Sequence, residues 1–190
     1  KRTSLPRPVQ TPHPPLWVGG VGPGNAERAA QRGLGMLFFA HKADFDVLRE
    51  STKAYRDNIG SAKTPYGVVN NQTAGFVNGL CGRDRDATRK LAAINTVEHS
   101  YHGAKYMLSG WPNDVPTPGY AHVTGGETKM LYDAITADKQ GVADLLMEGG
   151  FIMAGTPEDC IALLDEFKRS GVDQIIIHMQ MGGVPHEKIM

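Results

Sequence analysis

A glycine-rich turn near the start of the chain is the segment best suited to chemistry. Gly19–Asn25 reads GGVGPGN, and a helical pattern follows it as far as Arg32. Glycine permits positive φ and a close approach of backbone to a ligand, and the first turn of a helix offers unpaired N–H groups and partial positive charge. A phosphate group fits such a site; the alternative is a tight turn that only joins a strand to a helix. The residues predicted to bind a phosphate-bearing cofactor here are Gly20, Val21, Gly22, Gly24 and Asn25.

The ends of two predicted strands carry a second set of candidate residues. Side chains alternate between the faces of a strand, so Ile176, His178 and Gln180 share one face of the last strand, which becomes more polar toward its C-terminal end. His41 follows the second predicted strand. A strand histidine is also often a hydrogen-bonded core residue, and His41 suits a solvent-exposed position equally well. We predict a pocket lined by Ala40, His41, His178 and Gln180.

Other motifs argue against several kinds of chemistry. His99 and His102 stand one helical turn apart, but no third residue of suitable spacing accompanies them, so no metal site is predicted. The chain lacks a Gly-x-Ser-x-Gly turn, a P-loop lysine and a Cys-x-x-Cys pair, which argues against hydrolase, nucleotidase and thiol-redox functions. The spacing Gly20-x-Gly22-x-Gly24 brings the third glycine too early for a dinucleotide-binding fingerprint.

The charge balance and composition of the chain argue against two classes of partner, nucleic acids and membranes. The 190 residues include 20 Lys plus Arg and 20 Asp plus Glu, so the formal net charge is zero. Nucleic-acid binders normally carry a basic excess, so no nucleic acid is expected as a partner. Apolar runs such as Gly35–Ala40 fall far short of the ~20 residues that cross a bilayer, so no membrane is expected either. Cys81 and Cys160 are predicted to be buried, reduced thiols of a cytoplasmic protein.

Strand-like and helix-like patterns alternate along the chain, which is typical of βα units and a parallel sheet. A proline-rich connector, 1–15, precedes them, and 110–127 is an irregular excursion of the kind that often forms a lid. Four strands with intervening helices form either half of a (β/α)₈ barrel or a small open sheet. Strands are predicted over 16–18, 36–40, 67–79 and 173–179, and helices over 25–32, 44–58, 84–107, 128–147 and 156–171.

Five sequence blocks decide between these two architectures. PVQTPHPPLWV at 8–18 and NAERAAQRG at 25–33 resemble the fifth strand and following helix of the bacterial luciferase-like flavin-dependent monooxygenases. AGTPEDC at 154–160, SGVD at 170–173 and MGGVP at 181–185 resemble later blocks of the same family, in the same order. The resemblance implies an α/β fold that is the C-terminal half of a (β/α)₈ TIM barrel. It also implies that the N-terminal strands lie before this chain and the final helix after it.

The resemblance further implies a function. Members of this family use reduced FMN, delivered by a separate flavin reductase, and molecular oxygen to oxygenate a small organic substrate through a flavin C4a-peroxide. The glycine-rich turn would then receive the FMN phosphate. Gln180 falls where the luciferase pattern carries an acid close to the flavin, so the amide argues against identical chemistry. No catalytic residue is assigned, because the groups that shape the peroxide pocket come largely from the missing strands.

Two alternatives to this function stay open. Some members of the same superfamily use a deazaflavin as a hydride carrier and do not activate oxygen. The chain could also be a non-catalytic flavin-binding or structural module. The full-length protein is expected to form a homo- or heterodimer, and a half barrel by itself is expected to leave two sheet edges uncovered.

Overall fold

In the computed structural model, the described residues are 9–39, 45–65, 67–110 and 126–190. They fall into two compact units, and each unit is described by itself. Unit 1 consists of Lys1–Ala40, Asp44–Phe76 and Asp165–Ile176, and unit 2 consists of His41–Ala43, Val77–Leu164 and Ile177–Met190. The excursion predicted at 110–127 lies almost wholly outside the described residues.

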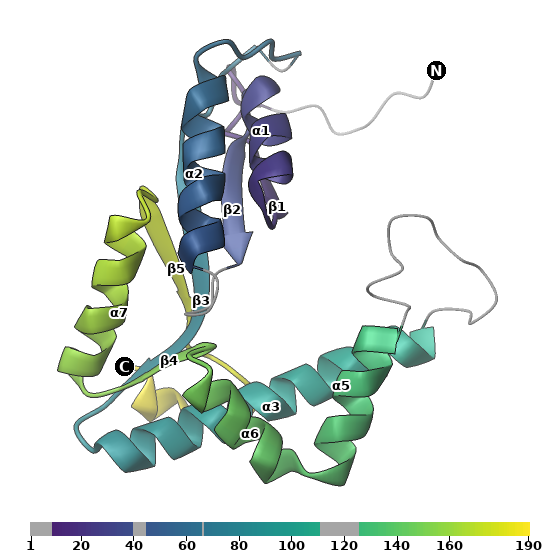
Figure 1. Ribbon diagram of the computed structural model, residues 1–190, viewed down its shortest axis with the longest axis vertical. Helices are drawn as coiled ribbons and strands as arrows, with labels where there is room; N and C mark the ends of the chain where they lie inside the picture. Colours follow the sequence, from purple (N-terminus) through teal and green to yellow (C-terminus); the bar gives the residue numbers. More distant parts are fainter. Residues whose placement is uncertain (1–8, 40–44, 66, 111–125) are drawn as a thin grey trace. The chain divides into compact units, whose positions relative to one another are not determined.

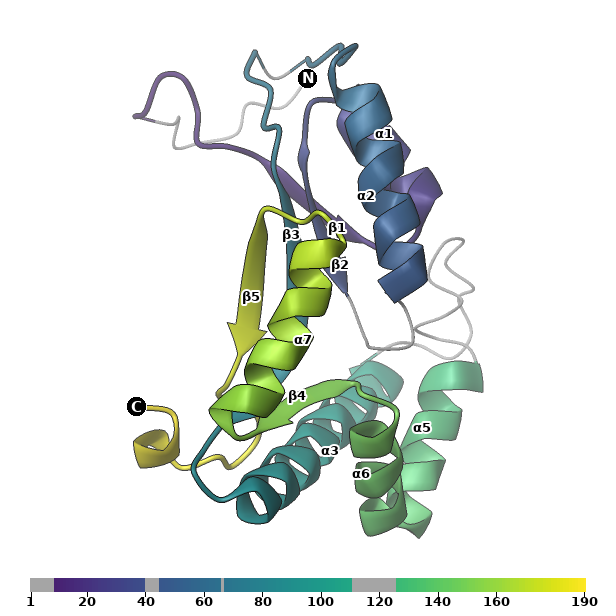
Figure 2. The same cartoon turned by 60° about the vertical axis from the view of Figure 1, so that its left-hand side comes forward.

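Parallel strands alternate with helices along the chain (Figure 1). The strands pair in the order β1-β2-β3-β4, the three pairings along this path are parallel, and β5 pairs with β3 (Figure 2). The predicted α/β fold is therefore confirmed. The elements of unit 1 begin with β1 (Trp17–Gly20), α1 (Pro23–Gln31), β2 (Gly35–Phe39) and α2 (Phe45–Ile59). They are followed by β3 (Thr73–Cys81), α3 (Arg85–Gly110), α5 (Gly126–Ala137), α6 (Lys139–Glu148), β4 (Ile152–Gly155), α7 (Pro157–Arg169), β5 (Gln174–His178) and the short 3-10 turn η2 (His186–Lys188).

Helices α1 and α2 pack side by side in unit 1 (Figure 1). Buried alanines on α1 allow close approach, and α2 buries an apolar side chain at every third or fourth position, as its sequence period predicts. The hydroxyl of Tyr55 donates to the carbonyl oxygen of Asn70 at 2.7 Å. The carbonyl oxygen of Leu34 lies 2.9 Å from the same hydroxyl oxygen. Burial raises the pKa of Tyr55 above its usual value, so this phenol remains a donor.

Unit 2 is built around α3, α5 and α6 (Figure 1), whose buried side chains meet those of β4 and of the segment after β5. The single helix predicted over 128–147 is wrong, since two helices are separated at Asp138. The Asp138 carboxylate accepts a hydrogen bond from the Gly141 N–H at 2.9 Å, which caps α6 and starts a new helix there. Met181 is fully buried in this core and accepts a hydrogen bond at Sδ from Thr96.

Strand β4 is a fifth strand that the four-strand prediction missed. All four of its residues are buried, and it pairs with the second half of β3 in the register Asn78↔Ile152 to Cys81↔Gly155. Four residues are too few to display a strand period. Strand β3 also begins later than predicted, at Thr73, where its parallel pairing with β2 begins in the register Met36↔Thr73.

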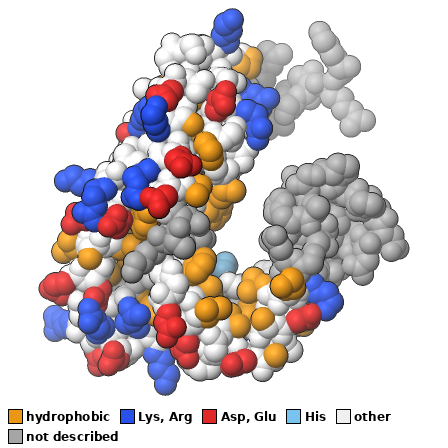
Figure 3. All heavy atoms as spheres, viewed as in Figure 1, with side chains coloured by type: hydrophobic (Ala, Val, Ile, Leu, Met, Phe, Trp, Pro, Cys, Tyr) orange, Lys and Arg blue, Asp and Glu red, His pale blue; other side chains and the backbone are white. Residues whose placement is uncertain are grey.

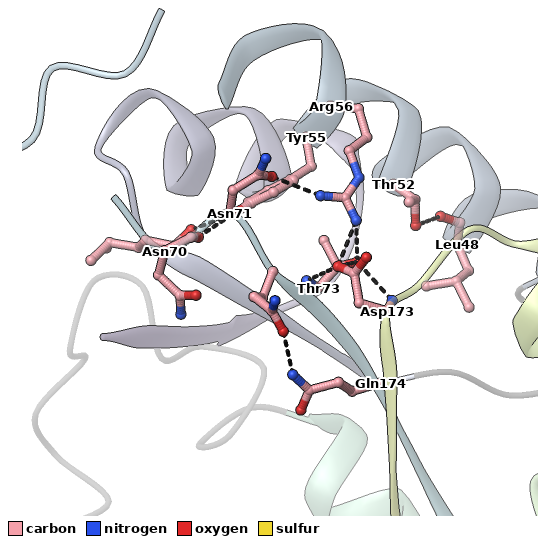
Figure 4. Close-up of polar contacts among 11 residues, drawn as sticks. Leu48, Thr52, Tyr55, Arg56, Asn70, Asn71, Thr73, Asp173 and Gln174 are labelled. Atoms are coloured by element: carbon pink, nitrogen blue, oxygen red, sulfur yellow. Dashed lines mark hydrogen bonds and ion pairs between the residues drawn. The ribbon is translucent and has the colours of Figure 1, made fainter. Parts of the chain in front are cut away.

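A polar network ties the beginnings of β3 and β5 together in unit 1 (Figure 4). The Asp173 carboxylate accepts hydrogen bonds from the Thr73 N–H at 2.7 Å, the Thr73 hydroxyl at 3.0 Å and the Arg56 guanidinium at 2.5 Å. Burial opposes ionisation of Asp173, but the bonds from Arg56 and Thr73 outweigh it and lower its pKa below the usual value. Because chemistry in parallel α/β barrels gathers at the opposite, C-terminal ends of the strands, this network serves stability.

On the face shown in Figure 3, cationic and anionic side chains are interspersed with one another. The exposed ion pair between Lys53 and Asp57 on α2, at 2.5 Å, is an example. Among the described helices, none is both long and apolar enough to cross a membrane.

Candidate functional site

The turn between β1 and α1 has the geometry of an open helix N-terminus. Gly22 occupies the N-cap position with φ of +79°, a conformation that side chains disfavour, and Pro23 follows at the first helical position. No side chain of the described residues caps this helix, and its first turn contains no acid. A Cβ built at Gly24 would meet nothing within 4 Å, so space is open beside the backbone there. The first-turn N–H groups and the helix dipole thus face a place where an anion fits.

Asn25 stabilises the turn through its side chain. Its Nδ2 donates to the Val21 carbonyl oxygen at 2.8 Å, and its Oδ1 accepts a hydrogen bond from Arg28. The side chain is therefore engaged within the turn, and the group that Asn25 offers to a ligand is its backbone N–H. Packing around Gly20 is tight, because a Cβ there would lie 3.0 Å from Met36 Cε and 3.3 Å from the Asn25 Cβ.

A small pocket of about 150 Å³ adjoins this turn. Two cationic side chains that are not among the predicted site residues line it. Arg28 and Arg32 line it together with Gly19 and Asn25. Both arginines lie on or directly after α1, one helical turn apart, and that spacing behind a glycine-rich turn was a usable signal. They place positive charge beside the predicted phosphate site.

A second pocket of about 330 Å³ is lined in part by Val21 and Gly22 of the turn. Apolar side chains of β2 and α2 line it, among them Phe39 and Leu48. Ser51 also lines it, is 1% exposed, and its hydroxyl has no hydrogen-bond partner among the described residues. A buried hydroxyl in this condition costs free energy unless a bound group or water completes it. The pocket therefore has an apolar wall, with one unsatisfied hydroxyl buried beside it.

His178 lies at the end of β5 in unit 2, and its neighbours include Asn78 and His99. Its Nδ1 is 3.1 Å from Oδ1 of Asn78 on β3, which is within hydrogen-bond distance. Its ring meets the His99 ring edge to face, with centroids 5.3 Å apart. Asn78 and His99 were missed as neighbours of His178, because they come from β3 and α3 and no local spacing links them.

The other candidate residues have different surroundings. Gln180 follows β5, and its amide donates to the Val184 carbonyl oxygen at 2.8 Å. His102 contacts Glu98 at 3.1 Å while His99 contacts His178, so the two helical histidines do not converge. Ala40 and His41 lie outside the described residues. The glycine turn belongs to unit 1, and His178 and Gln180 belong to unit 2.

Comparison with known proteins places the chain in a wider context. The family described as luciferase-like monooxygenase matches residues 1–174. The chain is 27% identical over 178 residues to a 5,10-methylenetetrahydromethanopterin reductase of Archaeoglobus fulgidus, a match that covers 88% of this chain and 49% of that protein. The chain thus spans about half the length of this curated relative.

Two solved structures share the fold. One is the oxygenating constituent of 3,6-diketocamphane monooxygenase of Pseudomonas putida in complex with FMN, with a TM-score of 0.55, 13% identity, and coverage of 87% of this chain and 42% of that chain. The other is the coenzyme F420-dependent tetrahydromethanopterin reductase of Methanopyrus kandleri, with a TM-score of 0.52, 17% identity, and coverage of 92% and 48%. The predicted membership of the luciferase-like TIM-barrel fold is confirmed, with this chain covering about half of such a barrel.

Proposed function

The chain belongs to the luciferase-like monooxygenase family, and from this premise we propose that residues 1–190 supply the phosphate end of the flavin site in a flavin-dependent oxidoreductase. The observation that carries the proposal is the turn at Gly22–Asn25, with its positive φ, its uncapped helix and the open space at Gly24. A group that ends in a phosphate fits this turn, because the residues present donate N–H groups and add no acid.

Each residue of the turn has a distinct task in this proposal. The backbone N–H groups of Gly24 and Asn25 donate to phosphate oxygens, whereas Pro23 has no N–H to give. Arg28 adds positive charge beside the turn and fixes Asn25. The apolar pocket beyond Gly22 excludes water from the part of the ligand that it covers.

The proposed reaction is a monooxygenation that uses reduced FMN, molecular oxygen and a small organic substrate. The bound reduced flavin would supply the electrons for oxygen activation. The fold shared with an FMN-containing monooxygenase supports this choice. We assign no catalytic residue. A separate flavin reductase, a dimeric full-length protein and a cytoplasmic location stay predictions.

A deazaflavin-dependent hydride transfer is the second candidate. The 27% identity to a methanopterin reductase and the fold shared with an F420-dependent reductase favour it. The turn at Gly22–Asn25 suits both cofactors, because FMN and F420 each carry a phosphate group. The choice between them must therefore come from the reaction rather than from the phosphate site.

Cofactor binding by the full-length protein tests the phosphate site. The change Gly24→Val fills the open space beside the first-turn N–H groups and should weaken FMN or F420 binding about tenfold, the equivalent of about one lost hydrogen bond of 1.4 kcal/mol. Gly60→Val is the matched control, because a Cβ at Gly60 also meets nothing within 4 Å but lies after the end of α2. Equal affinities in the two folded variants would remove the turn from the site.

The reaction itself separates the two candidate functions. Oxygen consumption with reduced FMN and an organic acceptor supports the monooxygenase, whereas reduction or oxidation of F420 without oxygen uptake supports the hydride-transfer enzyme. A full-length protein that binds neither cofactor contradicts both.

A further inference from the structure

The two cysteines of the chain meet in unit 2, although they are distant in sequence. Cys81 ends β3 and pairs in register with Gly155, the last residue of β4. Cys160 lies on α7, the helix that begins directly after β4, and its Sγ is 4.0 Å from the carbonyl oxygen of Leu80. The Cys160 Sγ therefore lies beside the peptide that joins Leu80 to Cys81. Strand pairing and the start of α7 bring the two cysteines close together.

The two thiols differ in their access to solvent. Cys160 is buried, whereas Cys81 is exposed, which corrects the sequence-based prediction that both are buried. Burial, reinforced by Cys81 and Asp159, raises the pKa of the Cys160 thiol to about 12, so Cys160 stays protonated at neutral pH. An oxidant in solution thus reaches Cys81 first. The Cys160 thiol is shielded from solvent and uncharged.

We propose that Cys81 and Cys160 form a peroxide-sensitive thiol pair that closes to a reversible disulfide. Cys81 sulfur attacks one oxygen of hydrogen peroxide, the O–O bond breaks, and sulfenic acid and one water form. Cys160 sulfur then attacks the Cys81 sulfur and displaces hydroxide, which leaves as the second water with the Cys160 proton. Two thiols are oxidised by two electrons in total, and one peroxide is reduced to two waters.

The second step requires the two sulfur atoms to approach to about 2.05 Å. The Cys160 Sγ already lies 4.0 Å from the carbonyl oxygen of Leu80, the residue before Cys81. The bond would tie the end of β3 to the first turns of α7 and close a loop that contains α3, α5, α6 and β4. Reaction with peroxide is independent of flavin binding, so this proposal does not rest on the proposed function.

Mass spectrometry on the full chain tests the proposal. The reduced protein is treated with a small excess of hydrogen peroxide, its remaining thiols are blocked with a maleimide, and it is digested without reductant. We expect a peptide pair that joins Cys81 to Cys160, a loss of two hydrogen atoms in mass, no maleimide on either cysteine, and full reversal by dithiothreitol. The thermal unfolding midpoint should rise by roughly 5 °C or more in the oxidised protein.

Single substitutions supply the controls. Cys81→Ser, an exposed change, should leave Cys160 as an intact thiol after peroxide and abolish the midpoint shift. Cys160→Ala should leave Cys81 to accumulate as sulfenic or sulfinic acid. In the unsubstituted chain, Cys81 carrying added oxygen beside an intact Cys160 thiol would overturn the proposal. So would dimers linked through Cys81 as the main oxidised product.

Discussion

Removal of the Asp173 carboxylate is expected to destabilise the chain more than removal of the Asp57 carboxylate. In Asp173→Ala, the backbone N–H of Thr73 loses its acceptor, and Thr73 is fully buried. An unsatisfied buried donor costs about 1–3 kcal/mol. The ion pair with Arg56 is partly exposed, so its loss adds less than about 1 kcal/mol. The expected decrease in unfolding free energy is therefore about 1–4 kcal/mol.

Urea unfolding of the full chain, followed by circular dichroism, measures this decrease. Asp57→Ala is the matched control, since Asp57 makes only an exposed ion pair with Lys53 on α2 and should cost about 0.3–0.5 kcal/mol. Asp173→Asn keeps an oxygen that can accept from Thr73 and should fall between the two. If Asp173→Ala and Asp57→Ala destabilise the chain equally, the network in Figure 4 is not the stabilising feature we describe.

The same carboxylate predicts a pH dependence. The folded pKa of Asp173 is lowered, so its stabilising contribution is fully present above the unfolded pKa, about 3.9, and is lost as pH falls through the lower folded value. The stability difference between the unsubstituted chain and Asp173→Asn should be constant from about pH 5 to pH 7 and should shrink below about pH 4. A difference that grows on acidification would contradict the assigned hydrogen bonds.

Two further substitutions test packing and capping. Gly75→Ala should cost about 1–3 kcal/mol of unfolding free energy, because its Cβ would lie 2.6 Å from the ring of the fully buried Phe167. The control Gly60→Ala should be close to neutral. Equal urea midpoints for the two variants would refute the close approach at Gly75. Asp138→Ala should cost about 1 kcal/mol through loss of the α6 cap, measured as a lower thermal midpoint, and no change would mean that the break between α5 and α6 does not depend on this carboxylate.

Several features of this protein follow from short stretches of its sequence. The apolar spacing over 44–58 predicts α2 within one residue at each end, and Gly22 predicts a turn in which φ is in fact +79°. The alternation of strand and helix patterns predicts the α/β fold. These features are local, since helix period, turn conformation and capping depend on residues that are neighbours in the chain.

Tertiary structure alone decided which distant residues meet. Strand β4 became recognisable only through its pairing with β3, because four buried residues carry no period of their own. The contact of His178 with Asn78 and His99 joins β5, β3 and α3. The proximity of Cys160 to the end of β3, where Cys81 lies, depends on the same β3–β4 register and on the direction in which α7 leaves β4. Such contacts form because buried strands and helices pack at fixed distances from one another. Those distances cannot be read from the spacing of residues along the chain.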